Sequence, residues 1–170
     1  YAGRGIELIL DLAARLPEMH FLVVGGREDD LARVRQQASA LNNVTLTGFV
    51  PNADLPLYQA ASDVLLAPYQ QQVSASSGGN IAAFLSPMKL FEYLASGRPI
   101  LASQLPVLRE VLNKENAILL PGEDAAAWAA ALHALAADPA QRERLSSTAR
   151  QSAQAYSWQA RAAAILDGLG

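Results

Sequence analysis

The sequence contains no cysteine, has few charged residues and has no basic run. Without cysteine the chain forms neither disulfides nor thiolate metal sites, which fits a reducing compartment and leads us to expect a cytoplasmic location. With a net charge of −3 and no lysine or arginine cluster, nothing predicts binding to nucleic acid or to an anionic membrane. No apolar run reaches the roughly 18 residues of a transmembrane helix, and no signal peptide is expected.

What the sequence does contain is an alternation of two hydrophobic patterns. The chain of 170 residues is 51% hydrophobic, which suits one domain with a sizeable core. Short, continuously apolar runs closed by glycine or proline predict buried parallel strands at residues 21–24, 44–46, 64–67, 100–102 and 117–120. Stripes of helical period predict helices at residues 6–16, 29–41, 54–61, 86–96, 107–112, 125–137, 139–156 and 158–166. The order predicts an α/β fold, a doubly wound, Rossmann-like parallel sheet with helices on both faces.

The helix expected at residues 86–96 has both ends marked in the sequence. Ser86 can act as its N-cap, and Pro87 suits the first helical position, where no backbone N–H is needed. Gly97 can supply a left-handed C-terminal turn, and the following Pro99 prevents the helix from resuming.

Lys89 lies in the first turn of this helix, where the helix dipole disfavours a cation. A helix N-terminus with free N–H groups plus a lysine is a natural site for an anion, and phosphate is a frequent occupant. Glu92 and Tyr93 follow at spacings that place all three residues on about one helix face. The alternative is that Lys89 and Glu92 form a surface pair while the apolar residues of the helix, Met88 included, pack into the core.

Two other segments are candidates for a ligand site. Gly25-Gly26 follows an expected strand and resembles part of a dinucleotide fingerprint. The full G-x-G-x-x-G pattern is missing, so an ordinary strand-to-helix turn is favoured. Arg4-Gly5 precedes a helix, so Arg4 either points toward the same end of the sheet as Lys89 or is solvated.

The remaining polar and aromatic features point to no further chemistry. His20 and His133 stand singly and suggest no metal site, and no Ser/His/Asp set stands out as catalytic. Trp128 and Trp158 are expected to pack the terminal helices. Residues 69–85 form the longest irregular stretch, and loops of that length are more often functional or mobile than incidental.

Together these segments resemble the C-terminal, nucleotide-sugar-binding domain of a GT-B glycosyltransferase, closest to the retaining family 4 (group 1) enzymes. The resemblance spans essentially the whole chain, residues 1–170, and rests on the order and spacing of several segments. These are the segment with a basic residue and glycine at Arg4–Ile9, the strand and glycines at Phe21–Gly26, and the Gly-x-Val segment at Val44–Leu57. Two more are Ser86–Ile100, which carries the second glutamate of the family's E-x7-E signature, and Tyr156–Trp158, where the family's last helix begins. Tyr1-Ala2-Gly3 looks like the tail of the family's first strand, as in a chain cut from a longer one.

The resemblance implies roles for individual residues. Arg4 and Lys89 would neutralise the diphosphate leaving group, and Glu92 would accept hydrogen bonds from the nucleotide ribose. The remaining positions are implied to contact the nucleotide sugar: Gly25 after its strand, Phe49 and Val50 at the base, and Ser86, Pro87 and Met88 at the phosphates or sugar. We expect neither a metal nor a cofactor at these positions.

The sequence departs from the family pattern in two places. The first glutamate of the family's E-x7-E signature falls at Phe84, which cannot bond sugar hydroxyls, so the loop before it is expected to supply a substitute. The family also places a second basic residue just after the first strand's glycine. Here Arg4 is the only cation in that stretch.

The implied activity is transfer of a sugar from a UDP- or GDP-linked donor to an acceptor with retention of configuration. The acceptor site is expected on an N-terminal domain absent from this chain, so the fragment should bind donor without efficient transfer. Any membrane contact would belong to that absent domain. Two alternatives are a nucleotide-sugar epimerase of GT-B architecture and a non-catalytic α/β binding domain that has lost its donor site.

Overall fold

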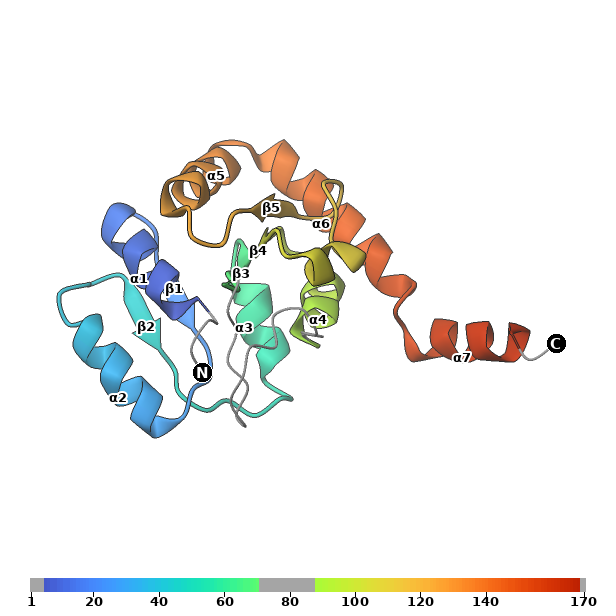
Figure 1. Cartoon of the computed structure of the whole chain (residues 1–170), viewed down its shortest axis with the longest axis horizontal. Helices are drawn as coiled ribbons and strands as arrows, with labels where there is room; N and C mark the ends of the chain where they lie inside the picture. The colour runs from blue at the N-terminus through green and yellow to red at the C-terminus, as the bar shows by residue number, and fades with distance from the viewer. Residues whose placement is uncertain (1–4, 71–87, 169–170) are drawn as a thin grey trace.

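The computed structural model describes residues 5–70 and 88–168, in which helices and strands alternate (Figure 1). The strands are β1 (Phe21–Val23), β2 (Val44–Leu46), β3 (Leu65–Ala67), β4 (Ile100–Ser103) and β5 (Ile118–Leu120). The helices are α1 (Ile6–Arg15), α2 (Glu28–Gln37), α3 (Leu55–Ala61), α4 (Lys89–Ser96), α5 (Ala125–Ala137), α6 (Pro139–Gln154) and α7 (Trp158–Asp167), with a 3-10 helix η2 (Pro106–Glu110). None of the helices in this described part is long and apolar enough to cross a membrane.

All strand pairs in the described residues are parallel, as the alternation of helices and strands predicts. β1 pairs with β2, and β3, β4 and β5 form a second group in that order. Within residues 5–70 and 88–168 the two groups are not joined by strand hydrogen bonds. The predicted parallel α/β fold is confirmed, with the strands divided into a pair and a trio.

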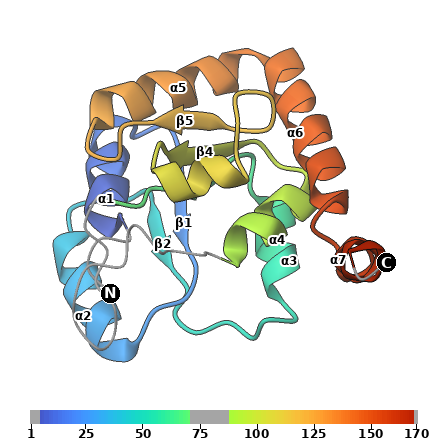
Figure 2. The same ribbon diagram turned by 45° about the vertical axis from the view of Figure 1, so that its right-hand side comes forward.

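Helices cover both faces of the central strand β4, all four residues of which are buried. Side chains alternate across a strand, so Ile100 and Ala102 face one way and Leu101 the other. Ile100 and Ala102 belong to a core cluster with residues of α4 and η2. Leu101 belongs to a second cluster built from α1 and α5. In Figure 2, α5 runs beside β5 and α6 passes beside α4.

Helix α1 shows which way the strands run. The side-chain amide of Asn43, just before β2, donates to the carbonyls of Ala13, Leu16 and Met19 at the C-terminal end of α1. At the other end of α1, Gly5 packs against Pro68, which directly follows β3. The strand starts therefore lie near the C-terminus of α1, and the carboxyl ends of β1, β2 and β3 lie toward its N-terminus.

Two predicted helices differ from the structure. α2 ends at Gln37, before the expected Leu41, because the chain tightens into i→i+3 turns there, with Ser39 N–H donating to the Gln36 carbonyl. The helix expected at residues 107–112 is a 3-10 helix, which begins at Pro106. Residues 38–41 carry neither glycine nor proline, so the periodic pattern alone does not reveal where α2 ends.

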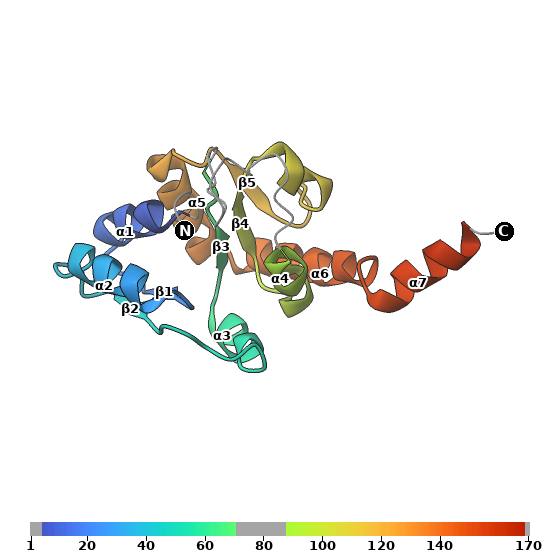
Figure 3. The same cartoon turned by 60° about the horizontal axis from the view of Figure 1, so that its bottom comes forward.

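The two tryptophans have opposite surroundings. Trp128 of α5 is fully buried, and its indole N–H donates to the Pro121 carbonyl at 2.8 Å, so its predicted packing role is confirmed. The prediction for Trp158 is wrong, since its side chain is 78% exposed. The reason is the position of α7, which extends away from the rest of the molecule in Figures 1 and 3.

Candidate functional site

The end of β3 and the start of α1 meet at a contact that only glycine permits. Gly5 stands at the N-cap of α1 with φ of 84°, and a Cβ there would lie 2.0 Å from the Pro68 carbonyl oxygen. The first amide groups of α1 therefore lie next to the chain leaving β3. Helix N-termini carry free N–H groups and a partial positive charge, both of which favour anions.

Two glycine turns follow β1 and β2 at the same side of the molecule. Gly25 and Gly48 form an isolated antiparallel bridge, in which the Gly25 N–H donates to the Gly48 carbonyl at 2.9 Å. Both have positive φ, which side chains other than glycine rarely adopt. Among residues 5–70 and 88–168, nothing lies within 4 Å of where a Gly25 Cβ would stand, so this part of the chain leaves the backbone there accessible to a ligand.

Phe49 and Val50 come directly after the second glycine turn. Phe49 is 84% exposed and Val50 is half-buried. An exposed phenylalanine ring offers a flat apolar surface of the kind that bases stack on.

Helix α4 begins at Lys89, so this residue lies in its first turn as predicted. Met88 occupies the N-cap position in a helical conformation, makes no side-chain cap hydrogen bond and is 65% exposed, so it does not pack into the core. Gly97 has φ of 64° at the C-cap, which confirms the predicted left-handed turn. The other predicted positions Arg4, Ser86 and Pro87, together with Phe84, lie outside the described residues.

The Lys89 ammonium lies over two aromatic rings. Its Nζ is 4.6 Å from the centre of the Tyr69 ring and 5.9 Å from that of Tyr93. Tyr93 shares the helix face of Lys89, as the four-residue spacing predicts. Glu92, three residues after Lys89, is exposed. Leu90 and Leu94 of the same helix are buried, as the alternative for this helix expected.

Both rings are tied to β3. Tyr69 follows the strand by two residues and is only 1% exposed. The Tyr93 hydroxyl donates a long hydrogen bond of 3.5 Å to the carbonyl of Leu66 in β3. Burial, and to a lesser degree the charge of Glu92, raises the pKa of Tyr93 to about 12, so its phenol stays neutral at physiological pH.

Tyr69 is the site residue that sequence reasoning missed. It lies twenty positions before Lys89, so no helical or strand period connects the two. The only signal is its place directly after a predicted strand and its closing proline, where parallel strands present ligand-binding residues. Tyr69 also joins the site to a cavity of about 200 Å³ beyond β4 and β5, whose other lining residues are Gln104, Leu105, Pro121, Gly122 and Glu123.

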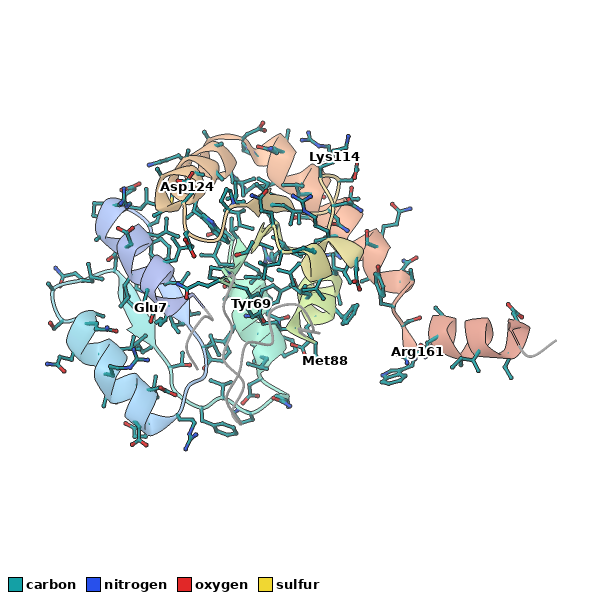
Figure 4. All side chains as sticks on the ribbon, viewed as in Figure 1. Glu7, Tyr69, Met88, Lys114, Asp124 and Arg161 are labelled. Carbon is teal, nitrogen blue, oxygen red and sulfur yellow. The ribbon has the colours of Figure 1, made fainter. Side chains whose placement is uncertain are left out.

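Two groups of the kind that favours phosphate lie against the residues just after β3. The ammonium of Lys89, the first residue of α4, lies over the ring of Tyr69, and the N-cap residue of α1, Gly5, lies against Pro68. Such groups neutralise phosphate oxygens. In Figure 4, Tyr69 lies near the middle of the view and Met88 at the near end of α4, far from Lys114 at the periphery.

Comparison with known proteins agrees with this geometry. Residues 3–138 match the family described as "Glycosyl transferases group 1". A D-inositol 3-phosphate glycosyltransferase of Xylanimonas cellulosilytica is 31% identical over 180 residues, covering 98% of this chain and 40% of that protein.

Solved structures show the same fold. Sucrose-phosphate synthase from Thermosynechococcus elongatus superposes with a TM-score of 0.78 at 24% identity, over 99% of this chain and 43% of its own. HepE of Anabaena, crystallised in complex with UDP, superposes with a TM-score of 0.73 at 20% identity, over 90% of this chain and 41% of its own. At these identities the likeness concerns the fold alone.

The chain thus spans about two fifths of the length of each of these proteins. The family match covers most of the 170 residues and includes β1 to β5 and the helices α1 to α5. The chain therefore belongs to the group 1 glycosyl transferase family.

Proposed function

We propose that this chain is the donor-binding domain of a glycosyltransferase that moves a sugar from a nucleotide diphosphate donor to an acceptor with retention of configuration. The observation that carries the proposal is the Lys89 ammonium, which lies over the ring of Tyr69 just after β3, in a chain of the group 1 family. Cleavage of the donor's glycosidic bond leaves negative charge on the diphosphate. Cations and helix amides positioned in advance stabilise that charge.

A different part of the chain would contact the diphosphate, the ribose and the base. Lys89 and the first amides of α1 would bind the diphosphate, and Arg4, the residue before Gly5 in the chain, would add a second cation. Glu92 is exposed on α4, where its carboxylate is able to accept hydrogen bonds from ribose hydroxyls. The base would lie against the exposed ring of Phe49.

The sugar of the donor is proposed to be linked to UDP or to GDP. HepE, a protein of the same fold, was crystallised in complex with UDP, which supports UDP rather than GDP. Gly25 is bridged to Gly48, which directly precedes Phe49, so backbone groups near Phe49 and Val50 would read the base rather than charged side chains.

The acceptor is proposed to bind on a separate N-terminal domain, because the chain corresponds to about two fifths of its relatives. The 170 residues alone would then bind donor but transfer sugar poorly. We propose a cytoplasmic location, and we assign any membrane contact to that other domain.

Calorimetric titration of the chain with UDP, GDP and their sugar conjugates tests the proposal. We expect one of the two nucleotides to bind, and Lys89→Ala to weaken binding about tenfold or more, since a charge-assisted hydrogen bond to phosphate contributes roughly 1.5–3 kcal/mol. Glu92→Ala should weaken the binding of nucleosides and of nucleotides alike, because the Glu92 carboxylate is proposed to contact the ribose, which both contain.

Lys114→Ala is the matched control. Lys114 is the only other lysine of the chain, its side chain is 92% exposed, and it lies away from the site (Figure 4). Its removal changes the net charge equally but should leave nucleotide affinity unchanged. The proposal would be contradicted if none of these nucleotides bound, or if the Lys89 and Lys114 variants lost equal nucleotide affinity.

A further inference from the structure

We propose that Tyr69 and Tyr93 are positioning residues that form a two-ring seat for the Lys89 ammonium and hold it where it meets a nucleoside diphosphate. This inference rests on the proposed function, because it assigns these rings a task in binding the donor's diphosphate. The rings would act through the lysine and not by touching the nucleotide. The seat is defined as the side chains of Tyr69 and Tyr93.

The distances support a direct attraction between the ammonium and the rings. A cation within about 6 Å of an aromatic ring centre is attracted by the electrons of the ring face. Lys89 Nζ meets this condition twice, at 4.6 Å from Tyr69 and 5.9 Å from Tyr93. The Tyr69 ring is almost fully buried, and such attraction is stronger where water is excluded.

The seat itself is held by close backbone contacts. The Tyr69 N–H donates to the Ala67 carbonyl at 3.0 Å. A Cβ at Gly122 would stand only 2.6 Å from the Tyr69 carbonyl oxygen, so the chain after β5 presses directly on this residue. Tyr93 is fixed from the other side by α4 and by its hydroxyl contact to Leu66.

A seat of this kind suits a lysine that must bind phosphate. The lysine side chain has four rotatable bonds and loses much conformational freedom on binding a ligand. Rings that hold the ammonium beforehand reduce that loss. Neutral rings also add no formal negative charge of their own, so they do not compete with phosphate as a carboxylate would. The affinity for the second phosphate of a nucleotide should therefore depend on the rings.

Nuclear magnetic resonance of the ligand-free chain tests the seat first. The chain has only two lysines, so the ε-methylene signals of Lys89 and the exposed Lys114 are readily compared. We expect the Lys89 signal to be shifted upfield by the rings, to remain so in Tyr69→Phe, and to move toward the Lys114 position in Tyr69→Leu. Coincident signals of the two lysines in the unaltered chain would overturn the proposal.

Titration with UDP against UMP, and GDP against GMP, then tests what the seat does. We expect Tyr69→Leu to reduce the preference for diphosphate over monophosphate by about three- to tenfold, as loss of a buried cation–π contact implies. Tyr69→Phe, which keeps the ring, should retain the preference. Tyr58→Leu, a half-buried tyrosine on α3, serves as the matched control.

The outcomes separate the seat from the function. Equal loss of diphosphate and monophosphate affinity in Tyr69→Leu would indicate a merely structural role and would overturn the inference, as would a loss in Tyr69→Phe as large as in Tyr69→Leu. If Tyr69→Leu fails to fold, Tyr93→Leu provides the same comparison. Failure of the unaltered chain to bind any of the four nucleotides would refute the proposed function, and the positioning role with it, while the ring-shifted Lys89 signal would still show the seat.

Discussion

Gly5 and Gly25 differ in what a side chain would meet, although both have left-handed backbone with φ of 84° and 94°. At Gly5 a Cβ would overlap the Pro68 carbonyl, whereas at Gly25 it would meet none of the residues that the structure describes. Gly5 is thus required by packing as well as by conformation. Gly25 is required by its backbone conformation alone, as far as the described residues go.

This difference predicts unequal costs for the same substitution. Gly25→Ala should lower the free energy of unfolding by about 1–2 kcal/mol, the cost of placing alanine in the left-handed region. Gly5→Ala should lower it by more than about 3 kcal/mol, because the overlap adds to that cost. Urea denaturation of the two variants measures both values. Equal losses would show that the contact between α1 and the end of β3 is not as close as the structure has it.

At the scale of single residues, local chemistry was predictable and long-range contact was not. The left-handed turn at Gly97 and the shared face of Lys89 and Tyr93 follow from positions a few residues apart. The contact of Lys89 with Tyr69 depends on how the chain after β3 returns to α4, which no local pattern contains. The same holds for the exposed Met88, which a helical stripe assigns to the core.

Helix caps likewise differ in whether the sequence alone predicts them correctly. Asp124 precedes α5, and its carboxylate accepts a hydrogen bond from the Ala127 N–H at 3.0 Å. Asp54 precedes α3 in a helical conformation and makes no side-chain cap hydrogen bond. Both aspartates look alike in the sequence as possible caps, so only the backbone conformation distinguishes them.

We therefore expect Asp124→Ala to lower the free energy of unfolding by about 1 kcal/mol, the usual worth of a helix cap. Asp54→Ala, the matched control, should change it by less than about 0.5 kcal/mol, as at other surface positions. Thermal or urea unfolding followed by circular dichroism resolves the two. A larger effect at Asp54 than at Asp124 would contradict this assignment of the caps.

Most elements were predictable because their ends carry local signals. The helix α5 has the expected bounds, since Asp124 begins it and Pro139 prevents its continuation beyond Asp138. The end of α2 was not predictable, because residues 38–41 keep a helical composition while the backbone tightens. Predictions for residues 71–87, including the cap at Ser86 and the departure at Phe84, lie outside the described residues.

At the scale of the whole molecule, α7 stands apart from the folded body (Figure 3). Trp158, Ile165 and Leu166 on this helix are exposed, and none of them contributes to either core cluster. The sequence alone led us to expect a packed tryptophan because it shows that the residue is apolar. It does not show whether the helix carrying it contacts the body.

Deletion of residues 158–170 should therefore change the free energy of unfolding of the body by less than about 1 kcal/mol, since little apolar surface is removed from the core. Deletion of residues 146–170 is the comparison, because it also removes Ala149, which is buried in the core. That longer deletion should be strongly destabilising. A loss of several kcal/mol from the shorter deletion would show that α7 packs on the body in solution.

We propose that a nucleoside diphosphate binds where the strands β1, β2 and β3 end. Amide chemical-shift mapping of the ¹⁵N-labelled chain during titration with UDP and with GDP locates the bound nucleotide. We predict that the largest shifts fall on Gly25, Gly48–Val50 and Lys89–Glu92, while the amides of Asn43 and Ala117 at the strand starts are unchanged. Shifts concentrated at Asn43 and Ala117, or no shifts with either nucleotide, would contradict the claim.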